Sequence, residues 1–236
     1  MAAKNPDQQK LGLGHWMSCV LEECERADNG LDPEPVHDLR VALRRCRAMA
    51  EGLRALDADP SWKQMRKAGK ALFSCLGDLR DVQVMEEWGR KLGAPEDPVT
   101  QALLRSLAER ESVLRAEAAK ALQQFDRKQW KKWARALPRR ASRFRPGTLV
   151  FQHLALERWH EAHELHRRAL RDRSPASFHR LRIGLKHLRY IVENFLPQQH
   201  QDWGDDLKQL QDLLGEIHDL DVAWQTALQM NAFPDS

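Results

Sequence analysis

A segment of basic and apolar residues occurs twice in this chain. Residues 36–47 (VHDLRVALRRCR) align with residues 178–189 (FHRLRIGLKHLR) at a constant offset of 142. The shared basic positions are spaced by three, four and three residues, which places them within a sector of roughly 80° on an α-helix. A row of cations on one helix face repels itself and costs stability. A sequence that builds this row twice therefore indicates an anion that binds there.

The repeat continues beyond this segment. Residues 76–84 (LGDLRDVQV) align with residues 214–222 (LGEIHDLDV) at an offset of 138, and the same offset pairs Lys70 with Lys208 and Leu72 with Leu210. Residues 101–145 form an insertion that the second half lacks. Two halves with the same order of helical motifs predict two similar helical bundles in tandem.

Composition and punctuation both predict an all-α fold. Hydrophobic residues make up 42% of the 236-residue chain and charged residues 31%, and Ala, Leu, Arg, Glu and Gln dominate. Prolines at 33, 98 and 175 mark helix starts, Pro197 separates the last two helices, and Thr148 could cap a helix. We expect the last helix to end near Met230. Pro138, Pro146 and Gly147 mark an irregular link.

From these signals we expect one compact unit over residues 1–236. Its fold class is all-α, with two pseudo-symmetric antiparallel helical bundles. The first helical half covers about 8–125, a basic link about 126–147, and the second half about 148–231.

The four cysteines lack CxxC spacing and are expected to be reduced. We find no signal-peptide pattern and no apolar run of membrane-spanning length, so we expect a soluble cytoplasmic protein and no membrane partner.

Charge is distributed unevenly along the chain. Residues 1–100 carry 15 basic and 17 acidic side chains, residues 101–200 carry 22 and 9, and residues 201–236 carry 1 and 8. The net charge of +4 thus hides a basic middle between acidic ends. This pattern favours a positively charged internal surface or groove over a uniformly basic protein.

The basic rows lie beside the apolar stripes of their helices, which places them near a helix–helix seam. For a single helix, a solvated charged face would be the simpler interpretation, but its repetition in both halves favours a binding role. Arginine donates paired hydrogen bonds to phosphate oxygens, and a polyanion would raise the pKa of a nearby histidine. We interpret Asp81 and Asp219 as buried carboxylates that orient these cations, not as catalytic acids.

A second basic concentration spans residues 127–145, where Trp130, Trp133 and Phe144 interleave with nine Lys and Arg residues. Such a run could hold single-stranded nucleic acid, with bases stacked on the tryptophans. A solvated, partly flexible link is the alternative.

No catalytic or metal site emerges from the sequence. His37-Asp38 and His218-Asp219 suggest a metal-dependent HD phosphohydrolase, but the repeat partner of Asp38 is Arg180. His160-Glu161-Ala162-His163 does not match HExxH. A zinc site with His153, His160, His163 and His166 is the weaker alternative to ordinary helical histidines. We expect no enzyme, no cofactor and no resident metal.

The repeated segments, followed by LGDLRDVQV and LGEIHDLDV, resemble those of the CHAD domain (conserved histidine α-helical domain) from about Leu11 to Met230. The resemblance implies two helical bundles around a basic central cavity. It also implies binding of inorganic polyphosphate and association with polyphosphate granules. Many members are fused to a triphosphate-hydrolysing tunnel domain, but no EXEXK strand motif occurs here, so that activity is not carried over.

The expected polyphosphate-binding residues fall on both halves of the repeat. They are His37, Arg40, Arg44, Arg45, Arg47, Arg66, Lys70, Arg80, His179, Arg182, Lys186, His187, Arg189, Lys208 and His218. The second half departs from the first at His187, opposite Arg45, and at His218, opposite Arg80. These histidines could make the affinity depend on pH.

We therefore expect a polyphosphate-binding module at granules in the cytoplasm, with granule proteins as possible partners. A nucleic-acid binder that uses residues 127–145 and an HD-type phosphohydrolase stay as alternatives. So do a scaffold that brings proteins to granules and a helical bundle with no polyanion ligand.

Overall fold

The computed structural model describes residues 12–229, and these residues form helices and no strand. The helices are α2 (Leu13–Asp28), α3 (Pro33–Arg54), α4 (Pro60–Leu92), α5 (Pro98–Gln124), α6 (Arg127–Ala141), α7 (Leu149–Asp172), α8 (Pro175–Phe195) and α9 (Pro197–Gln229). The prediction of an all-α fold is confirmed. The expected helix end at Met230 and the start of the first half at residues 8–11 lie outside the described residues.

Helix starts follow ordinary capping chemistry. Asp59 and Asp97 precede α4 and α5 and accept hydrogen bonds from backbone N–H groups at 2.8 Å, and Ser174 forms a reciprocal capping box with Ser177 at the start of α8. A proline lies in the first turn of each of these helices, where its missing N–H costs nothing. Thr148 directly precedes α7, as expected, but its side chain makes no capping hydrogen bond.

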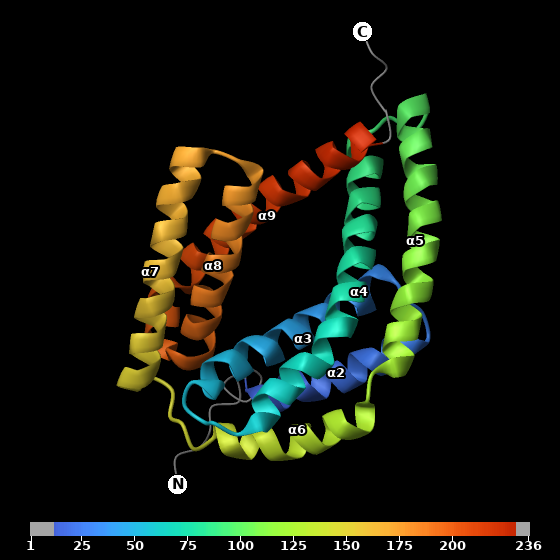
Figure 1. Ribbon diagram of the computed structural model, residues 1–236. Coiled ribbons are helices and arrows are strands. Elements are labelled where there is room, and N and C mark those ends of the chain that lie inside the picture. Colours follow the sequence, from blue (N-terminus) through green and yellow to red (C-terminus); the bar gives the residue numbers. More distant parts are fainter. Residues whose placement is uncertain (1–11, 230–236) are drawn as a thin grey trace.

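The helices form two groups that meet at the α3–α8 contact (Figure 1). In the first group α3 packs against α2 and α4, and in the second α8 packs against α7 and α9. Helix α5 lies along α4, and α6 packs across α2 and α4. The shared order of three helices is consistent with two related halves, to which the first adds α5 and α6.

The α3–α8 contact is close because position 52 is a glycine. A Cβ atom at Gly52 would lie 2.8 Å from Phe195 Cε2 and 3.2 Å from Ile191 Cδ1, so only a residue without a side chain lets the helices approach this far. Phe195 in turn stacks on Phe151 of α7, with ring centroids 4.3 Å apart. One continuous core cluster therefore runs from the first group of helices into the second.

The basic segment that we expected to be an irregular link contains a helix. Helix α6 continues through Pro138 to Ala141, so the prediction of irregular structure around Pro138 is wrong. The physical reason is burial: Trp130, Trp133 and Leu137 lie on one face of α6 and are all buried, which offsets the backbone hydrogen bond that proline cannot donate.

Ion pairs hold both ends of α6. Arg127 donates two hydrogen bonds to Asp28, at 2.6 and 2.8 Å, and Arg140 donates two to Asp57, at 2.7 and 2.8 Å. The Arg140 guanidinium holds the pKa of Asp57 well below its ordinary value. Two of the nine cations in this segment, Arg127 and Arg140, thus have a structural role.

The four cysteines are free, and burial raises the pKa of the Cys24 thiol to about 12. Among the helices between residues 13 and 229, none combines the length and the apolar character that a bilayer crossing requires.

Candidate anion-binding site

The two basic rows predicted from the repeat come together where α3 faces α8. The cations of α3 are close enough to lower the pKa values of two cations of α8, Arg182 and Lys186. The pKa of Lys186 is lowered to about 7, mainly by burial and then by the nearby positive charges of Arg182, Arg44 and Arg40. Burial is also the main cause of the lowered pKa of Arg182, to which Arg44 adds. Two rows that lie 142 residues apart in sequence are thus one cluster of mutually repelling cations.

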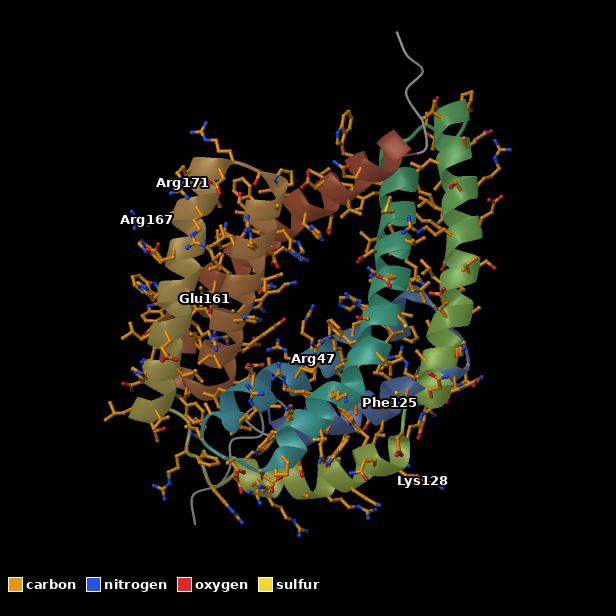
Figure 2. The ribbon with its side chains drawn as sticks, viewed as in Figure 1. Arg47, Phe125, Lys128, Glu161, Arg167 and Arg171 are labelled. Atoms are coloured by element: carbon orange, nitrogen blue, oxygen red, sulfur yellow. The ribbon has the colours of Figure 1, made fainter. Side chains whose placement is uncertain are left out.

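We define the basic cluster as Arg40, Arg44, Arg47, Arg182 and Lys186. These side chains are partly buried, and no carboxylate forms an ion pair with any of them within the part of the chain that the structure describes. Figure 2 shows Arg47 in the central part of the molecule, whereas Arg167 and Arg171 lie on the outer side of α7. The cluster therefore concentrates positive charge inside the protein, where screening by water and salt is weak.

Phe73 and Gly77 of α4 position the arginines of α3. The guanidinium carbons of Arg40 and Arg47 lie 5.0 and 4.6 Å from the centroid of the Phe73 ring. Arg40 Nη1 also donates to the carbonyl oxygen of Phe73 at 3.3 Å. A Cβ atom at Gly77 would lie 2.5 Å from Arg40 Nη1, so the glycine leaves the space that this guanidinium occupies.

Several buried donors in the cluster have no hydrogen-bond partner within the described protein. They are the Nε atoms of Arg44, Arg47 and Arg182 and the hydroxyl of Tyr190. Tyr190, the only tyrosine in the chain, lies beside Arg44, whose guanidinium carbon is 6.0 Å from the ring centroid. Buried donors are normally satisfied, so these atoms are the ones an anion could engage.

Four other predicted residues pair with carboxylates of the protein. Arg45 forms an ion pair with Glu193, and Arg189 Nε lies 3.8 Å from the same carboxylate. Arg66 pairs with Glu51, and Arg80 with Glu87 at 3.2 Å. Their charges are thus partly neutralised by the protein itself. The sequence reasoning missed Glu193, although its position four residues after Arg189 is a recognisable ion-pair spacing.

The predicted histidines lie in different places. His179 Nδ1 and His218 Nδ1 are 3.5 Å apart, and burial followed by the charge of Arg182 lowers the pKa of both. His37 remains exposed, yet partial loss of solvent and the charge of Arg80 lower its pKa. His187 is also exposed, and the nearest charges acting on it, after desolvation, belong to Arg158 and Glu161 of α7. It therefore lies toward α7, away from the basic cluster.

The remaining predicted residues differ in their exposure to solvent. Lys70 and Lys208 are exposed on α4 and α9. Asp219 is half-buried, but Asp81 is exposed, so the expectation that both are buried is wrong for Asp81. The protein still removes enough water from Asp81 to raise its pKa, against the opposing effect of Arg40. The negative charges of both aspartates raise the pKa of Arg182, so both carboxylates lie near this cation.

A pocket of about 510 Å³ lies beside the cluster, between α4, α5, α8 and α9. Asp81, His179, His218 and Arg110 contribute to its lining. At neutral pH the lowered pKa values of both histidines leave these rings largely uncharged. The pocket therefore gains positive charge as the pH falls.

The alternative sites look different from the cluster. Trp130 is fully buried in α6 and its Nε1 donates to the carbonyl oxygen of Met17 at 3.1 Å, so it presents no ring for stacking a base. Asp38, the aspartate of the phosphohydrolase alternative, forms an ion pair in which its Oδ2 lies 3.4 Å from Arg26 Nη1. Within residues 12–229, no group of three His, Cys, Asp or Glu side chains could hold a metal ion.

Fold and site together define an all-helical protein in which two repeated helices bring their cations together. The CHAD domain family model matches residues 17–228, so the chain belongs to the CHAD domain family. A crystal structure of the CHAD domain from the plant Ricinus communis is similar, with a TM-score of 0.71 and 24% identity over 93% of this chain and 76% of that chain. Comparison with curated protein sequences gives no match.

Proposed function

We propose that this CHAD protein binds inorganic polyphosphate through the basic cluster, without acting on it as an enzyme. The observation that carries the proposal is the convergence of two repeated cationic rows on each other in a partly buried place, where burial and then the neighbouring arginines lower the pKa of Lys186 to about 7. Such crowding destabilises the unliganded protein. A ligand that carries about one negative charge per phosphate would relieve it.

The chemistry of the cluster favours a polyanion without bases. Four of its five members are arginines, whose planar forks suit phosphate oxygens. The aromatic rings nearest to them, Phe73 and Tyr190, lie beneath guanidinium groups. These rings already contact arginines of the protein and are not free to stack on nucleic-acid bases. Nucleic acid is the second candidate, because residues 127–145 remain strongly basic on their exposed face.

The test is a calorimetric titration with long-chain polyphosphate at two salt concentrations, with single-stranded DNA as the comparator. We expect tight binding at low salt and a steep fall as salt rises, because binding releases counterions. We expect DNA to bind much more weakly. Equal or stronger binding of DNA would contradict the proposal, and so would the absence of binding to polyphosphate.

A matched pair of variants locates the site. The first replaces Arg40, Arg44, Arg47 and Arg182 of the basic cluster by alanine, and the second replaces the exposed Lys128, Lys131, Arg135 and Arg139 of α6 by alanine. Both remove four positive charges. We expect the first to lower the slope of log affinity against log salt by roughly 3, and the second to leave affinity nearly unchanged. The opposite result would move the site to α6.

Two further proposals rest on polyphosphate binding. The protein associates with polyphosphate granules in the cell, where it could also recruit partner proteins. We also propose that it does not hydrolyse polyphosphate, since within residues 12–229 no group of three His, Cys, Asp or Glu side chains could hold a metal ion for such a reaction. Phosphate release that depends on Mg²⁺ or Mn²⁺, and that disappears with His37→Ala and Asp38→Ala, would support the phosphohydrolase alternative instead.

A further inference from the structure

An apolar groove lies between α7 and α9, on the second group of helices. Its volume is about 560 Å³, and its walls include Leu156 and Trp159 of α7 and Trp203, Leu207 and Leu210 of α9. Four of these side chains are strongly exposed: 61% for Leu156, 52% for Trp159, 53% for Trp203 and 43% for Leu210. Contiguous exposed apolar surface of this kind typically marks an interaction site.

The internal repeat shows what such a groove accommodates. With the offset of 138, Trp203, Leu207 and Leu210 correspond to Met65, Gly69 and Leu72 of α4. Met65 is 0% exposed and Leu72 is 1% exposed, and α6 packs against both α2 and α4.

The Trp130 ring is the part of α6 that enters this first groove. A Cβ atom at Gly69 would lie 3.2 Å from Leu43 Cδ2 of α3 and 3.7 Å from Trp130 Cζ3, so the tryptophan ring packs beside this glycine. The second group of helices has no counterpart of α6 within the described chain. The equivalent positions of α9 therefore form the wall of an open groove.

Charge indicates the kind of helix that would fit. Helix α9 carries seven acidic residues and a single lysine, Lys208, and Asp206 lines the groove. In the first group, the helix that fills the corresponding position is basic, and its Arg127 and Arg140 pair with aspartates at either end. An apolar groove that has Asp206 in its wall and runs along an acidic helix complements a helix that is basic on one side and aromatic on the other.

We propose that the α7–α9 groove binds a basic amphipathic helix of a partner protein, with aromatic side chains one turn apart on its apolar face. The helix would take the place on α7 and α9 that α6 takes on α2 and α4. This binding is separate from polyphosphate binding, because none of the groove residues belongs to the basic cluster.

The chain supplies a probe for the test. A fluorescent peptide with the sequence of residues 126–142 keeps the N-cap Asp126 and both tryptophans, and its binding to the full-length protein is measured by anisotropy at physiological salt. The matched control peptide carries Trp130→Ala and Trp133→Ala at the same charge. The protein control carries Leu156→Glu and Leu210→Glu, at exposed positions where a change of fold is not expected.

We expect saturable binding that weakens at least tenfold, roughly, with either control. Polyphosphate affinity should be the same in the groove variant and the unmodified protein. Three results would overturn the proposal: no binding, equal binding of both peptides, or binding that survives the groove variant. Light scattering that shows a dimer dissociated by the groove variant would also overturn it, since the occupant would then be a second copy of the chain.

Discussion

Lys186 illustrates the conflict between stability and binding at the level of one residue. Its pKa of about 7 in the folded protein lies far below the ordinary value of 10.5. The charged form is therefore favoured in the unfolded chain. The resulting cost to folding is complete below about pH 7 and disappears as the pH rises toward the ordinary value.

We expect Lys186→Met to stabilise the unliganded protein. The gain in the free energy of unfolding should be roughly 2 kcal/mol at pH 6, or about 4–8 °C in Tm. It is smaller than the full pKa shift implies, because water still reaches part of the side chain. It should shrink as the pH rises above 7. Thermal unfolding at pH 6 and pH 9 checks the prediction, and a loss of stability at pH 6 would show that Lys186 is well accommodated.

The same lysine should make polyphosphate binding take up protons. A bound polyanion favours the charged form, so the affinity should fall between pH 6 and pH 8, by at most about tenfold per pH unit above 7 for one proton. The Lys186→Arg variant stays charged throughout and should lose this dependence. Titration at pH 6, 7 and 8 measures it. The dependence that remains below pH 6.5 would come from His179 and His218, whose lowered pKa values place their charging there.

Two glycines at equivalent positions of the repeat offer an internally controlled pair. Alanine at Gly77 would collide with Arg40 Nη1, whereas alanine at Gly215 meets nothing within 4 Å. Both changes raise helix propensity by up to about 1 kcal/mol. We expect Gly215→Ala to stabilise the protein without changing its affinity for polyphosphate, and Gly77→Ala to weaken binding several-fold. Titration of both variants with polyphosphate checks the prediction, and equal affinities of the two variants would show that the position of Arg40 is unimportant for binding.

At the level of elements, α6 is the part whose role differs most from expectation. We expect Trp130→Ala to lower the free energy of unfolding by about 3–5 kcal/mol, because it leaves a large cavity and removes the hydrogen bond that Trp130 Nε1 donates to the Met17 carbonyl oxygen. Lys131→Ala, an exposed neighbour, should change it by less than about 0.5 kcal/mol. Urea denaturation compares the two. If residues 127–141 were a loose link, either change would lower the free energy of unfolding of the protein by less than about 1 kcal/mol, and such a result would contradict the prediction.

The sequence contained the signal for α6, but its charge obscured it. Trp130, Trp133 and Leu137 recur at i, i+3 and i+7, which indicates an amphipathic helix, yet the nine cations around them suggested a solvated segment. Helix starts were easier to predict, because proline and capping residues act locally. The expected all-α fold follows from such local signals and from the repeat.

The repeat also predicted which cations share a helix face, and the basic cluster contains five of the fifteen predicted residues. It could not predict which arginines have partners inside the protein. Arg45 and Glu193 are 148 residues apart, and their pairing depends on the packing of α3 against α8. Long-range contacts of this kind leave no local pattern in a single sequence.

For the whole molecule, the separation of the two rows along the chain affects how the protein reaches its folded state. The cations of α3 and α8 are far apart until the two groups of helices dock, and docking must then overcome their repulsion. Added salt screens this repulsion, so the unliganded protein should refold faster as salt rises, whereas its hold on polyphosphate weakens. The same charges thus make salt an aid to assembly and an obstacle to binding, and stopped-flow refolding at several salt concentrations would measure the first effect.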